Sequence, residues 1–427
     1  MGFTSIGKEA DTAIENLSFR NYCGFTSDID GAVGTIKDSQ GVVLWSEDKP
    51  GTTDTYNLIG DLKAVAAQNT VSYRNKQYIT SAEGYDLYEG VISLENSGLD
   101  INTTLDYELH KSVYEYMVEK GVTNGSALFM DAKTGAIVCA VSLPAADPTV
   151  EISQLPEGAL INKNFATTIP GSNMKVITGL LLTEIEPSIL KHEVYCDGSY
   201  ELPRGSSITC ITRRGTHNLE SALGVSCNCY YADSIVNILD QNADTIKGRL
   251  EELGISTQSA GKVMKGGKLT YTSSMAAYAG DGSFESVWAM IGEGKVMMSP
   301  LDMCRIVSGI VNDGTGKMPY IIENVTNSEG EIIDSYSAED SHITDAETAE
   351  TFYAIWKSAY DKYYGTEYHS EITFAKSGTA EYANKGVSKN LVGYLEEQGL
   401  VFFIEIADYE ESQLMPYEVV NYVCDMT

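Results

Sequence analysis

The stretch Ile169-Pro170-Gly171-Ser172-Asn173-Met174-Lys175-Val176-Ile177 decides how the middle of this 427-residue chain folds. A proline and a glycine interrupt regular structure, and the apolar residues that follow have the spacing of a buried helix. The pattern therefore predicts a turn that leads into a helix, with Ser172 in or near its first turn. Because residues three apart lie on one face of a helix, Ser172 and Lys175 are expected to be neighbours.

These two side chains have the chemistry of an activated nucleophile. A serine hydroxyl needs a nearby base, and a lysine serves as that base when burial lowers its pKa. The start of a helix also offers unpaired N–H groups that stabilise a developing negative charge. The spacing alone is weak evidence, however, because Ser-x-x-Lys also begins at Ser5, Ser46, Ser188 and Ser259.

The composition is that of a folded globular protein, with 43% apolar and 21% charged residues. The length favours two domains. With 60 acidic and 29 basic residues the net charge is −31, which argues against nucleic acid as a partner and against adhesion to anionic lipid. We interpret the acid excess as a solvated surface. No apolar run of about 20 residues occurs and no signal peptide is recognisable, so no membrane-spanning segment is expected.

Eight cysteines are scattered along the chain, and none belongs to a Cys-x-x-Cys pair. Cys227-x-Cys229 alone is too short a signal for zinc, so we predict no metal and interpret these two thiols as packing residues. Cys196 and Cys210 bracket a loop, and the sequence leaves open whether they form a disulfide or stay as two reduced thiols.

A boundary is expected at residues 96–100, where turn-forming residues separate an apolar run from a helical pattern. We interpret residues 1–98 as an accessory domain in which Gly34–Trp45 forms two strands around a turn. In the remainder, strands are expected at 127–130, 136–141, 372–376, 391–395 and 401–406. Helices are expected at 107–118, 218–225, 346–360 and from Ser299 onward, and residues 263–290 read as irregular. The two early and three late strands fit one antiparallel sheet with helices packed on it, an α+β fold.

Three motifs follow one another in this second part. Ser172-x-x-Lys175 starts a buried helix, Ser226-x-Asn228 lies on a loop after a helix, and Lys376-Ser377-Gly378 lies at a strand end. Each is weak alone, since Ser388-Lys389-Asn390 and Lys133-Thr134-Gly135 repeat two of them. Together they resemble, in type and order, the motifs of penicillin-binding proteins and serine β-lactamases.

The resemblance covers about residues 100–427 and points to class B penicillin-binding proteins. Met130–Val138 is similar to the hairpin that opens their transpeptidase domain, which makes the first Lys-Thr-Gly a turn. Further stretches in the family's order are Asn162–Ser172, Cys196–Gly198, Cys210, Gly215–His217, Ile291–Gly294, Ser299–Leu301 and Lys376–Glu381. Asn173 stands where the family usually has Thr and Glu293 where Gln is usual, and neither is expected to take part in acylation.

The resemblance implies the transpeptidase fold: a five-stranded antiparallel sheet with helices on its faces and an all-helical subdomain. Residues 99–427 would form this penicillin-binding transpeptidase domain. Residues 1–98 would form a small, mainly β pedestal, to which Gly34–Trp45 is loosely similar.

The resemblance also implies a peptidoglycan D,D-transpeptidase in which Ser172 attacks the carbonyl of a D-Ala-D-Ala stem peptide. Lys175 would be the base, and Ser226 and Lys376 would relay the proton to the leaving amine. Asn228 would hold the side-chain amide of the acyl group. Ser172 would then carry an acyl-enzyme that an amine from a neighbouring strand resolves.

Substrate binding is assigned by the same resemblance to Ser377, Gly378 and Thr379. The hydroxyls of Ser377 and Thr379 would bind the terminal carboxylate of peptide or β-lactam, and the N–H groups of Ser172 and Thr379 would form the oxyanion hole. The implied partners are stem peptide or its lipid-linked precursor, β-lactam antibiotics, and cell-wall synthesis proteins that would bind residues 1–98. No cofactor is implied, and the expected location is the extracytoplasmic face of the bacterial membrane, with the anchor outside this chain.

Two alternatives stay open. A serine β-lactamase shares the acylation chemistry, although the N-terminal part and the resemblance in residues 291–301 favour the transpeptidase. A penicillin-binding sensor or scaffold without turnover would keep the same fold, although the intact motifs speak against it.

Overall fold

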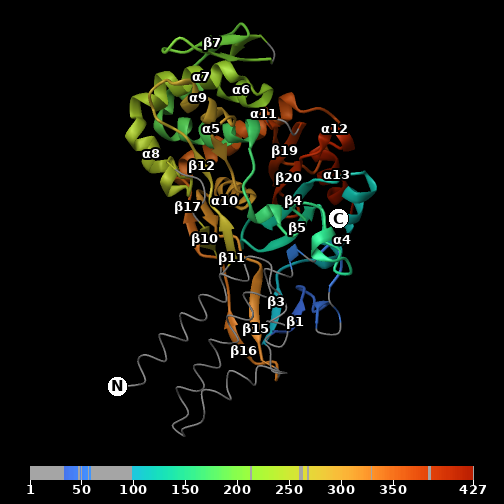
Figure 1. Ribbon diagram of the computed structural model, residues 1–427. Coiled ribbons are helices and arrows are strands. Elements are labelled where there is room, and N and C mark those ends of the chain that lie inside the picture. Colours follow the sequence, from blue (N-terminus) through green and yellow to red (C-terminus); the bar gives the residue numbers. More distant parts are fainter. Residues whose placement is uncertain are drawn as a thin grey trace, which may run out of the picture.

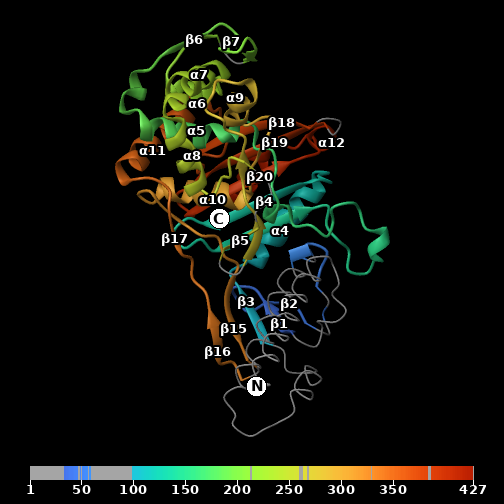
Figure 2. The same cartoon turned by 60° about the vertical axis from the view of Figure 1, so that its left-hand side comes forward.

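The computed structural model describes residues 33–46, 49, 51–55, 57–58, 99–211, 214–258, 263–266, 269–327, 329–382 and 386–426. Over these ranges the molecule is elongated (Figures 1 and 2). A narrow sheet occupies one end, a larger sheet with its helices the middle, and a group of helices topped by small hairpins the other end. None of the helices within these ranges has the length and apolar composition needed to cross a bilayer.

The middle of the molecule is a five-stranded antiparallel sheet, which confirms the predicted fold class. Its order β18-β19-β20-β4-β5 places the three late strands beside the two early ones. The strands are β4 (Gly125–Asp131), β5 (Ile137–Leu143), β18 (Phe374–Tyr382), β19 (Gly386–Leu395) and β20 (Leu400–Ile406). The inner strands are almost wholly buried, so their sequences read as continuous apolar runs.

The edge strand β18 lies further along the chain than predicted. The expected strand was 372–376, with Lys376-Ser377-Gly378 at its end, but β18 pairs with β19 from Phe374 to Tyr382. The prediction stopped early because the residues after Ala375 are small or polar, and only buried strands carry a continuous apolar signal. The third motif therefore lies within an edge strand, whose outer side presents backbone N–H and C=O groups.

The sheet lies between two groups of helices (Figure 1). One group contains α4 and α13, which pack on each other, and the other contains α10 and α11, with α5 beyond them. The helices are α4 (Tyr107–Glu119), α5 (Met174–Ile185), α6 (Leu219–Val225), α7 (Asn228–Ser234), α8 (Ala243–Glu252), α9 (Phe284–Ile291), α10 (Pro300–Val311), α11 (Ala346–Tyr363), α12 (Tyr409–Ser412) and α13 (Pro416–Met426). The four predicted helices are confirmed, whereas α9 lies in the stretch expected to be irregular, because eight residues between glycines give too short a pattern.

Helix α5 is the centre of the helical part. Almost all its residues are buried, and α6, α7, α9 and α11 pack around it. A helix that is apolar on all sides is stable only where neighbours enclose it. This enclosure fixes the beginning of α5, and with it the stretch that carries Ser172.

The narrow sheet joins strands from distant parts of the chain in the order β16-β15-β3-β1-β2. They are β1 (Val33–Lys37), β2 (Val43–Trp45), β3 (Leu99–Thr103), β15 (Ile322–Thr326) and β16 (Ile332–Ser335). The β1–β2 pair confirms the two strands expected in Gly34–Trp45. Most of residues 1–98, including the expected partner surface, lie outside the described residues, so the domain boundary at residue 98 stays a prediction.

Small two-stranded sheets complete the described fold. They pair β6 (Val194–Cys196) with β9 (Gly215–His217), β7 (Ser199–Glu201) with β8 (Ser207–Thr209), β10 (Val263–Gly266) with β11 (Leu269–Thr272), β12 (Met275–Ala276) with β13 (Val296–Met297), and β14 (Thr315–Lys317) with β17 (Asp340–His342). The β7–β8 hairpin lies at the end of the molecule opposite the narrow sheet (Figure 1).

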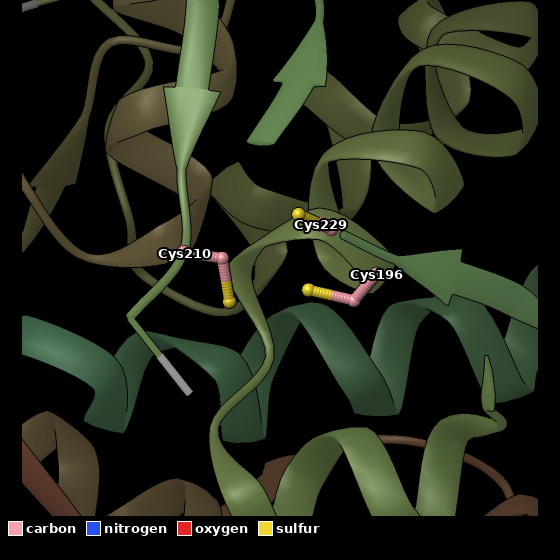
Figure 3. Close-up of side chains that lie close together, drawn as sticks. All are labelled: Cys196, Cys210 and Cys229. Carbon is pink, nitrogen blue, oxygen red and sulfur yellow. The ribbon is translucent and has the colours of Figure 1, made fainter. Parts of the chain in front are cut away.

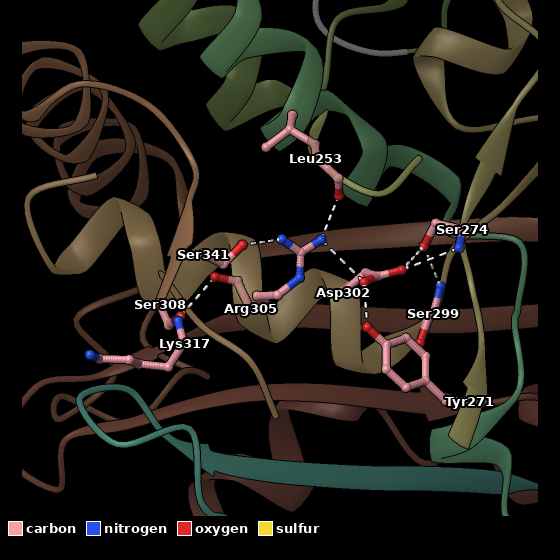
Figure 4. A network of polar contacts seen from close by, with 9 residues as sticks. All are labelled: Leu253, Tyr271, Ser274, Ser299, Asp302, Arg305, Ser308, Lys317 and Ser341. Atoms are coloured by element: carbon pink, nitrogen blue, oxygen red, sulfur yellow. Dashed lines mark hydrogen bonds and ion pairs between the residues drawn. The ribbon is translucent and has the colours of Figure 1, made fainter. Parts of the chain in front are cut away.

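A buried polar network fixes the start of α10 (Figure 4). Asp302 accepts hydrogen bonds from the Ser274 hydroxyl (2.6 Å) and the Tyr271 hydroxyl (3.1 Å), and Arg305 lies 3.2 Å from the same carboxylate. The Ser299 N–H donates to Ser274 Oγ (2.9 Å). Buried charges are tolerated when they are paired and hydrogen-bonded in this way.

This network also reaches the stretch that carries Ser172 through the backbone. Met298, the residue before Ser299, forms an antiparallel bridge with Thr168 through two hydrogen bonds, of 2.8 and 2.9 Å. Thr168 immediately precedes the stretch that begins at Ile169. The beginning of α10 and the approach to Ser172 therefore form one connected unit.

Candidate active site

Ser172 lies in a 3₁₀ turn, Gly171–Asn173, directly before α5. Gly171 has φ = +55°, and a Cβ there would lie 2.4 Å from the Thr379 carbonyl oxygen. Gly292, at the end of α9, has φ = +111°, and its Cβ would lie 1.7 Å from the Gly171 carbonyl oxygen. Only glycine satisfies both the backbone conformation and the space. The turn is therefore clamped between β18 and α9.

Lys175 is the centre of the hydrogen-bond network. Its Nζ lies 2.7 Å from Ser172 Oγ, 3.1 Å from Ser226 Oγ and 2.6 Å from Asn228 Oδ1. The Ser226 carbonyl oxygen lies 3.2 Å from the same Nζ, so four oxygens surround an amine that has at most three hydrogens to donate. The side chain is fully buried, and this burial lowers the pKa of Lys175 to about 8. An amine with this pKa exchanges protons readily near neutral pH.

Ser226 ends α6 in the left-handed conformation, with φ = +61° and ψ = +43°. Such a conformation costs about 1–3 kcal/mol in a non-glycine residue and is found at functional sites. Here it turns the chain so that Ser226 and Asn228 both reach Lys175. The loop predicted to carry Ser226 and Asn228 is only two residues long, because α6 ends at Val225 and α7 begins at Asn228. Its N-cap is Cys227, a residue type that gives no helix-start signal.

Asn228 is held from two sides. Its Nδ2 donates to the Thr209 carbonyl (2.9 Å), and its backbone N–H lies 3.2 Å from Cys210 Sγ. These contacts fix the amide so that its Oδ1 faces Lys175. The orientation of Asn228 therefore depends on the segment that follows β8.

Lys376 is the second buried amine. Its Nζ donates to the Ser377 carbonyl (2.6 Å). Burial, and then the charge of Lys175, hold the pKa of Lys376 well below its usual range. Because the positive charge of one amine disfavours protonation of the other, one of the two lysines is expected to be neutral. The first and third motifs therefore lie close enough for the charge of Lys175 to affect the pKa of Lys376.

The strand β18 aligns Ser377, Gly378 and Thr379 beside the turn that carries Ser172. A Cβ on Gly378 would lie 2.5 Å from the Pro170 carbonyl oxygen, so this position also needs glycine. The Ser377 N–H donates to the Tyr364 hydroxyl (3.0 Å), and Lys389 Nζ donates to Thr379 Oγ1 (3.1 Å).

Tyr364 and Lys389 are site neighbours that the sequence analysis missed. Tyr364 follows α11 and had no motif around it. Lys389 lies in Ser388-Lys389-Asn390, which was set aside as a repeat. Its pairing with Thr379 across β18 and β19 becomes visible only in the sheet register.

The two repeated motifs have structural roles. Asn390 Nδ2 donates to the Ile169 carbonyl (2.9 Å), and Ser388 Oγ donates to Asn390 Oδ1 (2.9 Å), so this pair supports the nucleophile stretch from the sheet. Lys133-Thr134-Gly135 lies in the turn between β4 and β5, where Asp131 accepts a hydrogen bond from the Thr134 hydroxyl (2.8 Å). This confirms its interpretation as a turn.

The two unusual residues both lie at the site. Burial, and then the charge of Glu381, raise the pKa of Glu293 to about 7, while Lys175 opposes this shift. Glu293 is therefore electrostatically linked to the base. The Asn173 side chain is fully buried, and neither its Oδ1 nor its Nδ2 has a hydrogen-bond partner.

The family match and two curated relatives of this chain are all penicillin-binding or transpeptidase proteins. The family described as the penicillin-binding protein transpeptidase domain matches residues 125–421. Penicillin-binding protein 3 of Bacillus subtilis is 27% identical over 248 residues, which are 53% of this chain and 35% of the relative. Peptidoglycan D,D-transpeptidase PbpA of Mycolicibacterium smegmatis is 22% identical over 253 residues, which are 53% of this chain and 49% of the relative. The chain thus spans half or less of the curated relatives it matches.

Solved structures have the same fold. PBPA from Mycobacterium tuberculosis aligns with a TM-score of 0.73 at 16% identity, over 92% of this chain and 99% of that one. The penicillin G acyl-enzyme complex of penicillin-binding protein A from M. tuberculosis aligns with a TM-score of 0.70 at 15% identity, again over 92% and 99%. At these identities the similarity establishes the fold.

Proposed function

The chain belongs to the penicillin-binding protein transpeptidase family, and we propose that it is a serine-type peptidoglycan D,D-transpeptidase that works through an acyl-enzyme on Ser172. The observation that carries this proposal is the position of Lys175 Nζ, fully buried and 2.7 Å from Ser172 Oγ. The D,D-transpeptidase name of the M. smegmatis relative supports it, as does the acyl-enzyme formed by the M. tuberculosis protein.

Acylation begins with the neutral form of Lys175. Its amine accepts the Ser172 proton as Oγ attacks the carbonyl carbon of the penultimate D-Ala. The N–H groups of Ser172 and Thr379 stabilise the oxyanion, an effect of about 10²–10³ in rate per donor. The close approach of Gly171 to Thr379 supports this pair of donors.

The proton then moves to the leaving amine. Ser226 Oγ lies 3.1 Å from Lys175 Nζ, so the proton passes from the lysine to this hydroxyl, which gives its own proton to the amine. The C–N bond breaks and D-Ala leaves, while Ser172 keeps the acyl group as an ester. An acceptor amine reverses these transfers and returns the proton to Ser172. Lys376 stays neutral while Lys175 is protonated, so the site holds one positively charged lysine during the proton transfer.

The edge of β18 binds the substrate. Ser377 and Thr379 offer hydroxyls for the terminal carboxylate, and Lys389 adds a positive charge at Thr379. Gly378 allows the strand to approach the nucleophile turn. Asn228 already uses Oδ1 toward Lys175 and one Nδ2 hydrogen toward Thr209, so its second Nδ2 hydrogen is the one that holds the substrate amide.

The remaining assignments follow from this activity. β-Lactams acylate Ser172 and stay bound, and the substrate, stem peptide or its lipid-linked precursor, places the protein outside the cytoplasm. We also propose that residues 1–98 form a pedestal that binds other cell-wall synthesis proteins.

One observation favours a second function, in which water replaces the acceptor amine as in a serine β-lactamase. Glu293 is a partly buried carboxyl group near Lys175 with a pKa of about 7, a value suited to a general base. Slow decay of the penicillin adduct supports the transpeptidase, whereas rapid turnover of penicillin supports the hydrolase.

Labelling with a fluorescent penicillin, followed by intact mass, tests the assignment. The wild-type protein is expected to gain one penicillin, and Ser172→Ala none. Ser188→Ala is the matched control, because Ser188 heads another Ser-x-x-Lys spacing but is exposed. Labelling that survives Ser172→Ala would disprove the site, and a wild-type protein that never labels would favour a sensor without turnover.

A further inference from the structure

Four buried cysteines gather beside the second motif. The sulfur atoms of Cys196, Cys210 and Cys229 all lie within 4.8 Å of one another, and their side chains converge (Figure 3). Cys227 Sγ lies 3.9 Å from Cys210 Sγ. All four side chains are at least nine-tenths buried.

The fold brings these thiols together from three segments. Cys196 ends β6, Cys210 follows β8, and Cys227 and Cys229 flank Asn228 at the start of α7. The sequence analysis interpreted the last two as packing residues, because Cys-x-Cys alone has too few ligands. Two further thiols at the same point change that interpretation.

The sulfur spacing fits a metal site. A tetrahedral zinc ion with Zn–S distances of about 2.3 Å places its sulfurs about 3.8 Å apart, whereas a disulfide requires about 2.05 Å. The 3.9 Å between Cys210 and Cys227 agrees with the first value. The sulfurs of Cys196, Cys210 and Cys229, within 4.8 Å of one another, exceed it by about 1 Å at most. None of these four cysteines forms a disulfide.

The chemistry of the donors selects the metal. Sets of soft thiolates in tetrahedral arrangement take Zn²⁺ or iron rather than the hard cations that prefer oxygen.

We propose that Cys196, Cys210 and Cys229 bind one Zn²⁺ ion, to which Cys227, beside Cys210, adds the fourth thiolate, and that the ion fastens Ser226 and Asn228 in place. Two ligands flank Asn228 directly. The Asn228 N–H points at Cys210 Sγ (3.2 Å), as second-layer donors do around metal-bound sulfur. The metal thereby joins the β6–β9 and β7–β8 hairpins to the start of α7, and Asn228 contacts Lys175 at 2.6 Å.

Metal content tests the site independently of the reaction. The whole chain, purified without a metal-affinity step, is analysed for zinc by elemental mass spectrometry and intact mass. One zinc per chain is expected in the wild type and in Cys304→Ala, a buried cysteine of α10 away from the cluster. Cys196→Ala and Cys229→Ala are expected to lose the metal.

Cobalt substitution keeps the test valid if these variants fail to fold. Wild-type protein stripped of metal and titrated with Co²⁺ is expected to show thiolate-to-cobalt charge-transfer bands that saturate at one equivalent. Wild-type protein that holds no zinc and shows no such bands would overturn the proposal. So would a wild-type mass lowered by two hydrogens, which indicates a disulfide, or unchanged zinc in folded Cys196→Ala.

A second readout concerns the motif and rests on the proposed function. Removal of the metal is expected to slow penicillin labelling of Ser172 at least tenfold, and added Zn²⁺ should restore the rate. Zinc binding with an unchanged labelling rate would overturn the fastening role while leaving the metal site intact. Absence of labelling with zinc present would count against the transpeptidase and not against the metal.

Discussion

Lys175 Nζ lies 2.7 Å from Ser172 Oγ, and the lysine is completely buried while the serine is partly exposed. This asymmetry is consistent with the proposed roles of Ser172 as nucleophile and Lys175 as base. The exposed hydroxyl can reach a substrate, and the buried amine can lose its proton because desolvation disfavours its charge.

Acylation should depend on pH through Lys175. The amine acts as a base only when neutral, and its pKa is about 8. The rate of penicillin labelling is therefore expected to rise about tenfold per pH unit below 8 and to level off above it. Stopped-flow labelling between pH 6 and 9 measures this profile. A flat profile would show that Lys175 is not the base.

Glu293→Gln should shift that profile to lower pH. Ionised Glu293 raises the pKa of Lys175, so removing the carboxylate lowers it and increases the neutral fraction at pH 7. The same labelling measurement detects the shift. Glu285→Gln is the control, because Glu285 is exposed and pairs with Lys295. Equal pH profiles of labelling for the two variants would show that Glu293 does not affect the pKa of Lys175.

Tyr364→Phe should weaken the β18 binding edge. The change removes the acceptor of the Ser377 N–H, and a lost hydrogen bond costs about 0.5–1.5 kcal/mol. We expect labelling to fall a few-fold, mainly through the penicillin concentration at half-saturation. Tyr363→Phe, which alters a more exposed ring, should leave labelling unchanged. Equal effects of the two changes would refute the role of Tyr364.

Asn173→Thr should stabilise the protein. A buried polar group without a partner costs about 1–3 kcal/mol, and threonine places fewer polar atoms in the same space. A gain of about 1 kcal/mol raises the melting temperature by about 1–2 °C in a domain of this size. Thermal unfolding measures it. A lower melting temperature would mean that the asparagine amide is satisfied.

Asp302→Ala should destabilise the whole unit that positions Ser172. Removing one partner of a buried pair leaves the Arg305 charge uncompensated and costs about 3–5 kcal/mol. Asp340→Ala breaks the more exposed pair with Lys317 and should cost at most about 1 kcal/mol. Urea unfolding compares the two. Similar losses would show that the network does not hold α10.

The sequence predicted much of the site because local patterns carry it. The turn before a buried helix predicted Ser172 beside Lys175, and the distance confirms that pair. Residues 125–143 and 374–406 supplied apolar strands, so the five-stranded sheet was also predictable. The edge strand β18 was misplaced because its outer residues are polar, and α7 was missed because its N-cap, Cys227, gives no helix-start signal.

The sequence by itself therefore determined that Ser172 and Lys175 are neighbours and which apolar segments form strands, since these depend on spacing within single elements. Only the tertiary structure decided which of the repeated motifs meet, because Asn228 reaches Lys175 and Asn390 reaches Ile169 across the fold. It also decided that the sulfurs of Cys196, Cys210 and Cys229 lie within 4.8 Å of one another, with Cys227 beside Cys210. Sequence patterns describe neighbours along the chain, whereas a metal site is made by packing three segments against each other.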